Sequence, residues 1–134
     1  MASRILVVDD EQDIRQLVTL IIETAGHEVV QACNGTEGMR ALDQGKFDLV
    51  ILDIMMPEMD GWEVCRQIKH RPQSRKLPVL ILTVRSQPLD KVIGMEVVHA
   101  DHYLTKPFER QELLEAVNHL LEGKKAPVSA RATN

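Results

Sequence analysis

The sequence predicts an α/β protein built around a doubly wound, five-stranded parallel sheet. Short runs of β-branched and aliphatic residues recur along the chain, and each is followed by a segment with helical periodicity. Continuous apolar runs are typical of strands buried on both faces, as in parallel sheets. Strict alternation of strand and helix implies right-handed crossovers that place helices on both faces of the sheet.

Five segments have the composition of short strands. The second is half-exposed in character, whereas the first, third and fourth are largely aliphatic. The predicted strands are residues 5–8, 28–32, 48–52, 78–82 and 101–105. The strand order 2-1-3-4-5, as in flavodoxin-like (βα)5 folds, is taken from known doubly wound sheets and does not follow from these residues.

Five helices are expected after these strands. The first has the clearest apolar stripe, and Gly26 follows it where a helix C-terminus favours a residue free to adopt positive φ. The third must end before Pro72, and Gly94 weakens the fourth. The stripe of the first helix consists of Ile14, Leu17, Val18, Ile21, Ile22 and Ala25. The predicted helical segments are residues 14–25, 36–44, 62–68, 89–98 and 113–121.

Length and charge suggest one domain with no nucleic-acid or membrane surface of its own. The chain has 134 residues and a formal net charge of −4, which disfavours non-specific binding to polyanions. Its apolar runs are too short to span a bilayer and its N-terminus lacks a signal-peptide pattern, so we expect a cytoplasmic protein. We expect a folded domain over residues 1–122 and a disordered tail or linker over 123–134. The spacing of Cys33 and Cys65 favours two reduced, buried thiols.

Side chains of complementary chemistry follow four of the predicted strands. Because the carboxyl ends of parallel strands meet at one edge of the sheet, we expect three carboxylates, a hydroxyl and an ammonium group to converge there. Taken singly, each has a more ordinary interpretation, such as a helix cap, a turn residue or a solvated lysine. Their occurrence together at four strand ends favours a functional site. The residues are Asp9, Asp10, Asp53, Thr83 and Lys106, with Glu11 beside the first pair.

The expected chemistry is magnesium-dependent phosphoryl transfer. Closely spaced carboxylates repel one another, and a hard divalent cation such as Mg²⁺ relieves that repulsion. Lys106 adds a positive charge suited to phosphoryl oxygens. Asp53 stands alone at the end of a central strand, which makes it the best candidate for a nucleophile that forms an acyl phosphate.

Four motifs resemble the response regulator receiver domain of two-component signalling, including chemotaxis-regulator-like members. The resemblance extends over residues 3–121, and the motifs are specific in combination. They are residues 7–11 (VVDDE), 53–61 (DIMMPEMDG), 82–83 (LT) and 103–108 (YLTKPF).

The resemblance implies roles for individual residues. Asp53 would accept a phosphoryl group from a sensor histidine kinase or a histidine phosphotransfer protein. Asp10, Asp53 and the backbone carbonyl of Met55 would bind Mg²⁺, with Asp9 holding the ion largely through water. Lys106 would contact the phosphoryl oxygens, and its bond to Pro107 would be cis.

The resemblance also implies a switch. Thr83 would turn toward the new phosphate and Tyr103 would follow inward. This movement would remodel the surface of the fourth helix, fifth strand and fifth helix for a downstream protein, or for a homodimer. Such a domain is not a conventional enzyme, although it catalyses its own phosphorylation and slow autodephosphorylation.

Three departures from the family pattern stand out. His99 and His102 replace the usual glycine and acidic residue before the switch tyrosine; a variable loop is favoured over a metal site or a pH sensor. Val84 replaces a smaller residue after Thr83. With Met55 and Arg85 it is expected to hinder water and lengthen the phosphorylated lifetime.

Three other functions compete with this interpretation. A magnesium-dependent aspartyl phosphatase needs a second carboxylate two residues after its nucleophile, and Met55 occupies that position. A nucleotide or flavin module needs a glycine-rich loop after the first strand, which this chain lacks. A receiver used for docking without phosphorylation is disfavoured by the intact acidic pair, Asp53, Thr83 and Lys106, and only observed phosphorylation would exclude it.

Overall fold

A computed structural model gives the structure of the protein and describes residues 2–54, 56, 61–83 and 100–123. Within these ranges the elements follow one another as β1 (Arg4–Val8), α1 (Gln12–Thr24), β2 (Glu28–Ala32), α2 (Gly35–Gln44), β3 (Leu49–Asp53), α3 (Gly61–His70), β4 (Val79–Thr83), β5 (His102–Thr105) and α5 (Arg110–Leu121). The predicted helix at 89–98 and the tail from residue 124 lie outside the described residues.

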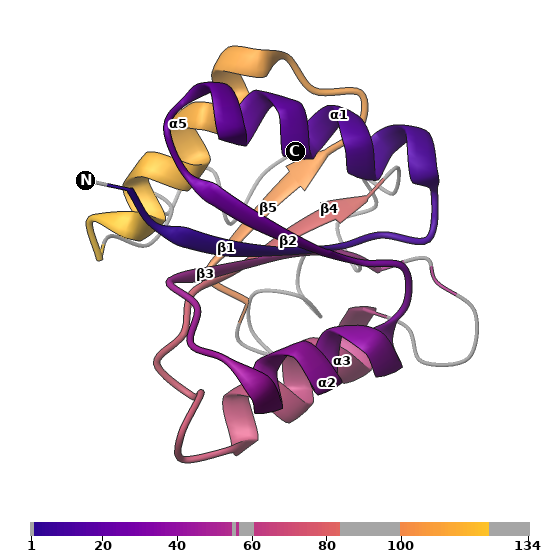
Figure 1. Cartoon of the computed structure of the whole chain (residues 1–134), viewed down its shortest axis with the longest axis vertical. Helices are drawn as coiled ribbons and strands as arrows, with labels where there is room; N and C mark the ends of the chain where they lie inside the picture. Colours follow the sequence, from indigo (N-terminus) through magenta and orange to yellow (C-terminus); the bar gives the residue numbers. More distant parts are fainter. Residues whose placement is uncertain (1, 55, 57–60, 84–99, 124–134) are drawn as a thin grey trace.

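The strands form one parallel sheet in the order β2-β1-β3-β4-β5, which confirms the predicted fold class and strand order. Pairing aligns Val8 of β1 with Leu52 of β3, and Asp53 with Leu82 of β4. Figure 1 shows α1 and α5 covering one face of the sheet and α2 and α3 covering the other. The carboxyl ends of the three central strands are therefore held side by side.

Alternation along the central strands divides the apolar core into two layers. In β1, Leu6 and Val8 pack in the layer of α2 and α3, whereas Ile5 and Val7 pack in the layer of α1 and α5. Successive side chains of a strand point to opposite faces, so a strand covered by helices on both sides needs apolar residues at every position. This explains the uninterrupted apolar runs of β3 and β4, in which every residue is buried.

The first helix ends as predicted but buries fewer residues than its stripe suggested. Gly26 adopts a φ of 95° just beyond α1. Val18, Ile21 and Ile22 are buried, whereas Leu17 is 47% exposed. The stripe spans a wider arc of the helix than the sheet covers, so the prediction was wrong at its margin.

The two cysteines differ in their surroundings. Cys65 is buried on α3, and burial raises the pKa of its thiol to about 12. Cys33 is exposed, so its predicted burial was wrong. It follows β2 at the edge of the sheet, where its backbone N–H donates to the Glu37 carboxylate over 2.9 Å. The side chain of Asn34 accepts from the Glu37 backbone N–H at 2.8 Å and caps α2.

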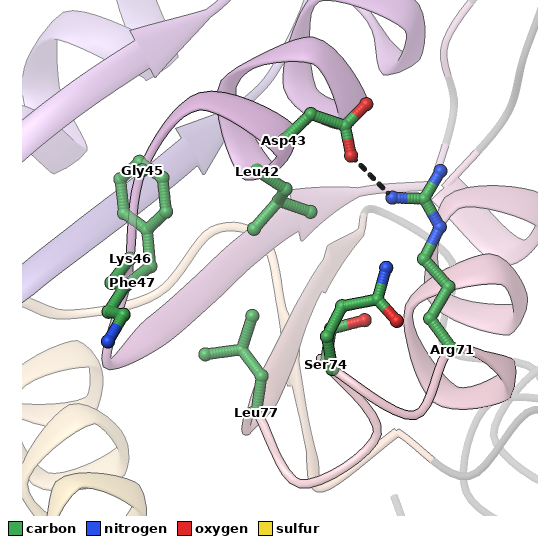
Figure 2. A pocket seen from close by; sticks show the side chains of 9 residues that line it. Leu42, Asp43, Gly45, Lys46, Phe47, Arg71, Ser74 and Leu77 are labelled. Carbon is green, nitrogen blue, oxygen red and sulfur yellow. Dashed lines mark hydrogen bonds and ion pairs between the residues drawn. The ribbon is translucent and has the colours of Figure 1, made fainter.

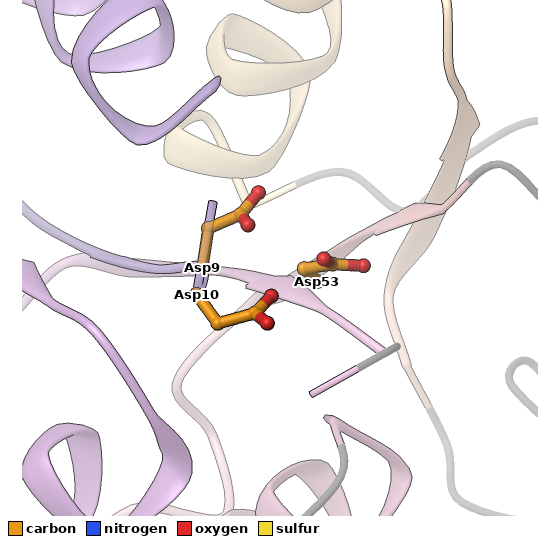
Figure 3. A group of neighbouring side chains, drawn as sticks. All are labelled: Asp9, Asp10 and Asp53. Carbon is orange, nitrogen blue, oxygen red and sulfur yellow. The ribbon is translucent and has the colours of Figure 1, made fainter. Parts of the chain in front are cut away.

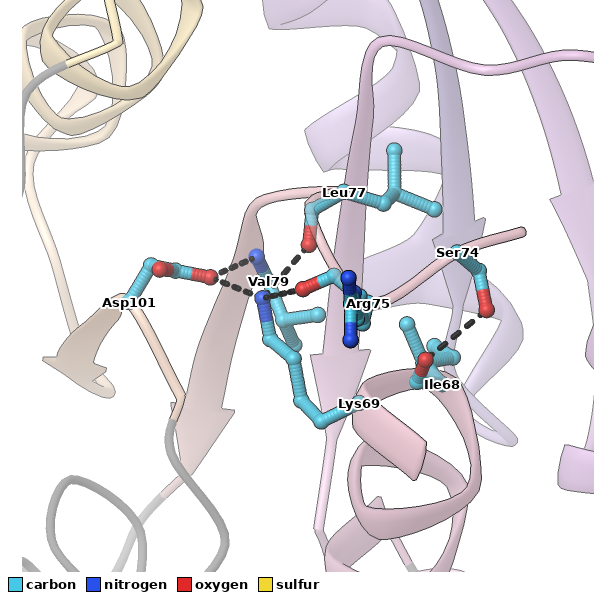
Figure 4. A network of polar contacts seen from close by, with 7 residues as sticks. All are labelled: Ile68, Lys69, Ser74, Arg75, Leu77, Val79 and Asp101. Atoms are coloured by element: carbon cyan, nitrogen blue, oxygen red, sulfur yellow. Dashed lines mark hydrogen bonds and ion pairs between the residues drawn. The ribbon is translucent and has the colours of Figure 1, made fainter. Parts of the chain in front are cut away.

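A largely covered ion pair fixes the start of β5 at the amino edge of the sheet (Figure 4). The Lys69 ammonium lies 2.6 Å from Asp101 Oδ2, and both side chains are almost covered. The same carboxylate oxygen accepts from the backbone N–H of Val79 at 2.8 Å. Lys69 also donates to the carbonyl oxygen of Leu77 at 2.7 Å. The end of α3, the turn before β4 and the start of β5 are thus joined by one polar network.

Candidate functional site

The carboxyl edge of the sheet brings together the side chains predicted from the sequence. Asp9 and Asp10 follow β1 directly, Asp53 is the last residue of β3, and Thr83 is the last residue of β4. Lys106 follows β5, and its backbone N–H donates to the Thr83 carbonyl oxygen over 2.6 Å. Four strands therefore deliver these groups to one edge, as strand topology requires.

The three aspartates form one acidic cluster (Figure 3). Each offers a carboxylate oxygen, and these oxygens all lie within 4.8 Å of one another. Asp9 and Asp53 are buried, whereas Asp10 is exposed. Carboxylates held this close repel each other, most strongly where burial reduces solvent screening. The cluster has the hard oxygen donors, the spacing and the open side that fit a magnesium ion.

Lys106 supplies positive charge to this cluster. Its Nζ lies 3.2 Å from Asp9 Oδ2, 3.5 Å from Asp53 Oδ2 and 3.7 Å from Glu11 Oε1. Burial alone would lower the pKa of Lys106, but the neighbouring carboxylates of Asp53, Asp9 and Glu11 outweigh it and raise the pKa above its ordinary value. The lysine is therefore an ammonium ion at neutral pH.

Hydrogen bonds to its side chain and to its backbone hold Asp9 in place. The Glu11 N–H donates to Asp9 Oδ1 over 2.9 Å. The Arg15 guanidinium donates to the Asp9 carbonyl oxygen at 2.8 Å. The Asp9 N–H in turn donates to the carbonyl oxygen of Ala32 in β2 at 3.1 Å. Asp9 is thus tied to the start of α1 and to the end of β2, and such preorganisation is what a charged site needs.

The two predicted switch residues are both buried. Thr83 is fully covered, and Tyr103 is 8% exposed. The ring of Tyr103 stacks on that of Trp62, with centroids 6.3 Å apart. The Lys106–Pro107 bond is cis, as predicted. His102 is half-buried, and its burial lowers the pKa of its imidazole.

Some predicted positions cannot be compared with the structure. Met55, Val84, Arg85 and His99 lie outside the described residues, so the proposed carbonyl ligand and the proposed barrier to water stay predictions. Among the residues described, His102 belongs to no cluster of metal-ligating side chains.

Two neighbours of the predicted site residues were not singled out from the sequence. Glu11 was noted beside the acidic pair but given no role, and its carboxylate approaches Lys106. Trp62 was interpreted only as part of an apolar helix face. An aromatic residue at a core position gives no sequence signal that separates packing against a switch residue from ordinary packing.

A pocket of about 420 Å³ lies elsewhere, at the amino edge of the sheet (Figure 2). Its apolar lining includes Leu42, Phe47 and Leu77, and an ion pair of 2.7 Å joins Asp43 to Arg71 at its rim. None of the clustered site residues lines it. Among the described residues, the predicted site residues therefore lie at the opposite edge of the sheet from this pocket.

None of the helices in the described ranges has the length and apolar content needed to cross a membrane.

Comparisons with known proteins agree with this architecture. The model of the response regulator receiver domain matches residues 5–118. The chain is 41% identical over 121 residues to the alkaline phosphatase synthesis transcriptional regulatory protein PhoP of Bacillus subtilis, covering 90% of this chain and 49% of that protein. It is 42% identical over 118 residues to the DNA-binding dual master transcriptional regulator RpaA of Synechocystis, covering 88% and 48%. The chain therefore spans about half the length of these curated relatives.

Solved structures give the same assignment. The signal receiver domain of a signal transduction histidine kinase from Syntrophus aciditrophicus superposes with a TM-score of 0.85 at 38% identity, covering 96% of each chain. The chemotaxis response regulator CheY4 of Vibrio cholerae gives a TM-score of 0.84 at 33% identity, covering 90% of this chain and 99% of that one. Together with the acidic cluster, the lysine beside it and the strand order, these matches show that the chain belongs to the response regulator receiver domain family.

Proposed function

We propose that this domain receives a phosphoryl group on Asp53, in a magnesium-dependent reaction, and transmits the change to a protein partner. The observation that carries the proposal is the convergence of Asp53 with two further carboxylates within 4.8 Å and with the Lys106 ammonium at 3.5 Å. A buried aspartate with a purely structural role would need only one positive charge to neutralise its carboxylate. This arrangement instead combines a nucleophile, a cation site and a fixed positive charge.

The expected reaction is a displacement at phosphorus. A carboxylate oxygen of Asp53 forms the new P–O bond, while the P–N bond to the donor histidine breaks and its electron pair returns to the imidazole nitrogen. With a proton on the other ring nitrogen of the donor phosphohistidine, the products are an acyl phosphate on Asp53 and a neutral histidine on the donor. Lys106 can stabilise negative charge on the phosphoryl oxygens from its position beside Asp53.

Asp10 and Asp53 would hold the magnesium ion, with the Met55 carbonyl as a further ligand and Asp9 acting largely through water. When bound, the ion would neutralise carboxylate charge and polarise the phosphoryl oxygens. The fit rests on the three oxygen donors of the cluster, of which Asp10 is open to solvent.

Transmission would pass through Thr83 and Tyr103. A phosphoryl group adds roughly two negative charges and strong acceptor oxygens. New contacts to Thr83 and Lys106 would favour one state of a two-state equilibrium. The responding surface would include β5 and α5, and its partner would be a downstream protein or a second copy of the domain. The donor would be a sensor histidine kinase or a histidine phosphotransfer protein in the cytoplasm.

Phosphorylation by acetyl phosphate tests the proposal. With Mg²⁺, intact-protein mass spectrometry should find one added phosphoryl group on the wild-type chain and none on Asp53→Asn. Asp43→Asn, at the opposite edge of the sheet, is the matched control and should be phosphorylated normally. Uptake by Asp53→Asn at the wild-type level would contradict the assignment. A properly folded wild type that takes up none from acetyl phosphate or a histidine donor would favour a docking receiver that is not phosphorylated.

A further inference from the structure

The only tryptophan and the only tyrosine of the chain lie against each other. The rings of Trp62 and Tyr103 have centroids 6.3 Å apart and planes inclined by 22°. Aromatic pairs at such separations attract each other beyond the burial of their surfaces. Trp62 is half-buried and packs on the same apolar layer as Tyr103. The buried orientation of the tyrosine therefore has an identifiable partner in α3.

Trp62 is also placed by the backbone beside the phosphoacceptor. The preceding residue, Gly61, donates its N–H to the carbonyl oxygen of Ile54 at 3.2 Å. A Cβ at position 61 would lie 2.6 Å from Ile54 Cα, closer than side-chain carbons approach backbone atoms. Glycine is needed here for close approach, not for a positive φ. The first turn of α3 thus rests directly on the residue after Asp53.

We infer that Trp62 is a positioning residue that holds Tyr103 in its buried orientation and connects it to the phosphoacceptor through α3. This connection runs from Asp53 through Ile54 and Gly61 to Trp62, and it is separate from the one through Thr83. The inference rests on the proposed function, because it assigns a second route by which the same site reaches Tyr103. A route of this kind requires evidence of energetic coupling as well as contact.

Two measurements on labelled protein read out this coupling. Since the chain has one tyrosine, 3-fluorotyrosine gives one ¹⁹F resonance, and its H₂O/D₂O isotope shift reports the exposure of Tyr103. The apparent affinity for beryllofluoride with Mg²⁺ reports how readily the phosphorylated state forms. Loss of a pre-positioned state lowers apparent affinity in proportion to its population.

Trp62→Leu should increase the exposure of Tyr103 and weaken beryllofluoride binding about 2- to 10-fold, the range expected for losing an aromatic pair. Trp62→Phe keeps a ring and should restore affinity to within about 2-fold of wild type. Phe47→Leu is the matched control, because Phe47 packs on the same layer but lines the pocket before β3, which β4 separates from β5; it should change neither readout. Equal effects from Phe47→Leu and Trp62→Leu would overturn the inference.

A double-mutant cycle tests whether the route is separate. Trp62→Leu should weaken binding by the same factor in wild type and in Thr83→Ala. No further weakening in the Thr83→Ala background would mean that Trp62 acts through Thr83, and would overturn the second route. An unchanged isotope shift in Trp62→Leu would overturn it as well. Failure of the proposed function itself has a different signature, namely a wild type that binds beryllofluoride no better than Asp53→Asn.

Discussion

Two largely covered lysine side chains, one at each edge of the sheet, contact aspartates in opposite circumstances. At the amino edge, Lys69 pairs with the single carboxylate of Asp101 at 2.6 Å and also donates to backbone carbonyl oxygens. At the carboxyl edge, Lys106 is surrounded by the carboxylates of Asp9, Asp53 and Glu11 at 3.2–3.7 Å. We call the network of Lys69 and Asp101 at the amino edge the closed network. We call the acidic cluster around Lys106 at the carboxyl edge the open cluster.

The difference lies in the balance of charge and hydrogen bonds. At the amino edge one cation meets one anion, and the shared Asp101 oxygen also accepts from Val79. That network is electrically neutral and joins α3, β4 and β5. At the carboxyl edge the acidic groups outnumber the lysine, so the cluster keeps a net negative charge that a divalent cation can offset. The network at the amino edge therefore stabilises the fold, whereas the cluster at the carboxyl edge retains the charge needed to bind a cation.

The largest expected effect on stability comes from opening the closed network. Asp101→Asn keeps an oxygen for the Val79 N–H but leaves Lys69 without a counter-ion in an almost covered position. Breaking a buried pair by removing one charge should lower the free energy of unfolding by about 2–3 kcal/mol. Urea unfolding measures this. Asp43→Asn, whose partner Arg71 is more exposed, should cost less than about 1 kcal/mol. Similar losses of free energy of unfolding in both variants would contradict the distinction between the covered pair of Lys69 and Asp101 and an exposed ion pair.

Magnesium should stabilise the open cluster. At a free Mg²⁺ concentration of roughly ten times its dissociation constant, mass action should raise the free energy of unfolding by about 1.4 kcal/mol. Asp10→Asn removes the solvent-exposed carboxylate of the cluster, so its gain should be much smaller. Thermal unfolding with Mg²⁺ or with EDTA compares the two proteins. Stabilisation of Asp10→Asn equal to that of wild type would place the ion elsewhere.

The substitution Asp53→Asn should raise the free energy of unfolding, whereas Asp101→Asn should lower it. In EDTA it removes one of the three mutually repelling carboxylates while the attraction of Lys106 to Asp9 is retained. Relative to wild type, we expect the free energy of unfolding to rise by about 1 kcal/mol in the absence of Mg²⁺. Most of that increase should disappear when the ion is supplied. Urea unfolding in both conditions measures the change. A destabilised Asp53→Asn in EDTA would mean that its charge is fully compensated.

The contrast between the edges was only partly predictable from sequence. Asp9, Asp53 and Thr83 could be placed together because strand alternation fixes which ends of the strands coincide, and that needs no coordinates. The strand order itself was taken from known folds. The pairing of Lys69 with Asp101 was not predicted, since residues 32 positions apart meet only through the packing of α3 against β5. Contacts set by packing have no periodic signal in the sequence.

The stack of Trp62 on Tyr103 was missed for the same reason. The apolar face of α3 predicted burial of its side chains, and Cys65 and Ile68 are indeed buried. Periodicity identifies the face but not the neighbour, because an apolar position can pack on any element of the same layer. The exposure of Leu17 shows the converse error, in which periodicity assigned a residue to a face that the sheet does not reach.

The smallest expected effect is the pH dependence of the open cluster. The pKa of Lys106 is raised in the folded state by Asp53, Asp9 and Glu11 despite the opposing effect of burial. A lysine with a raised folded pKa contributes stability that is fully present below its unfolded pKa, roughly 10.4, and that is lost as pH rises through the folded value. In EDTA, the stability advantage of wild type over Lys106→Gln should thus be constant near neutral pH and shrink above about pH 10. Urea unfolding of both proteins at each pH gives the difference between their free energies of unfolding. Effects of alkaline pH that are common to both proteins cancel in this difference. An advantage that grows with pH would mean that the ammonium form of Lys106 is not the form favoured by folding, and that the acidic cluster is not what holds its charge.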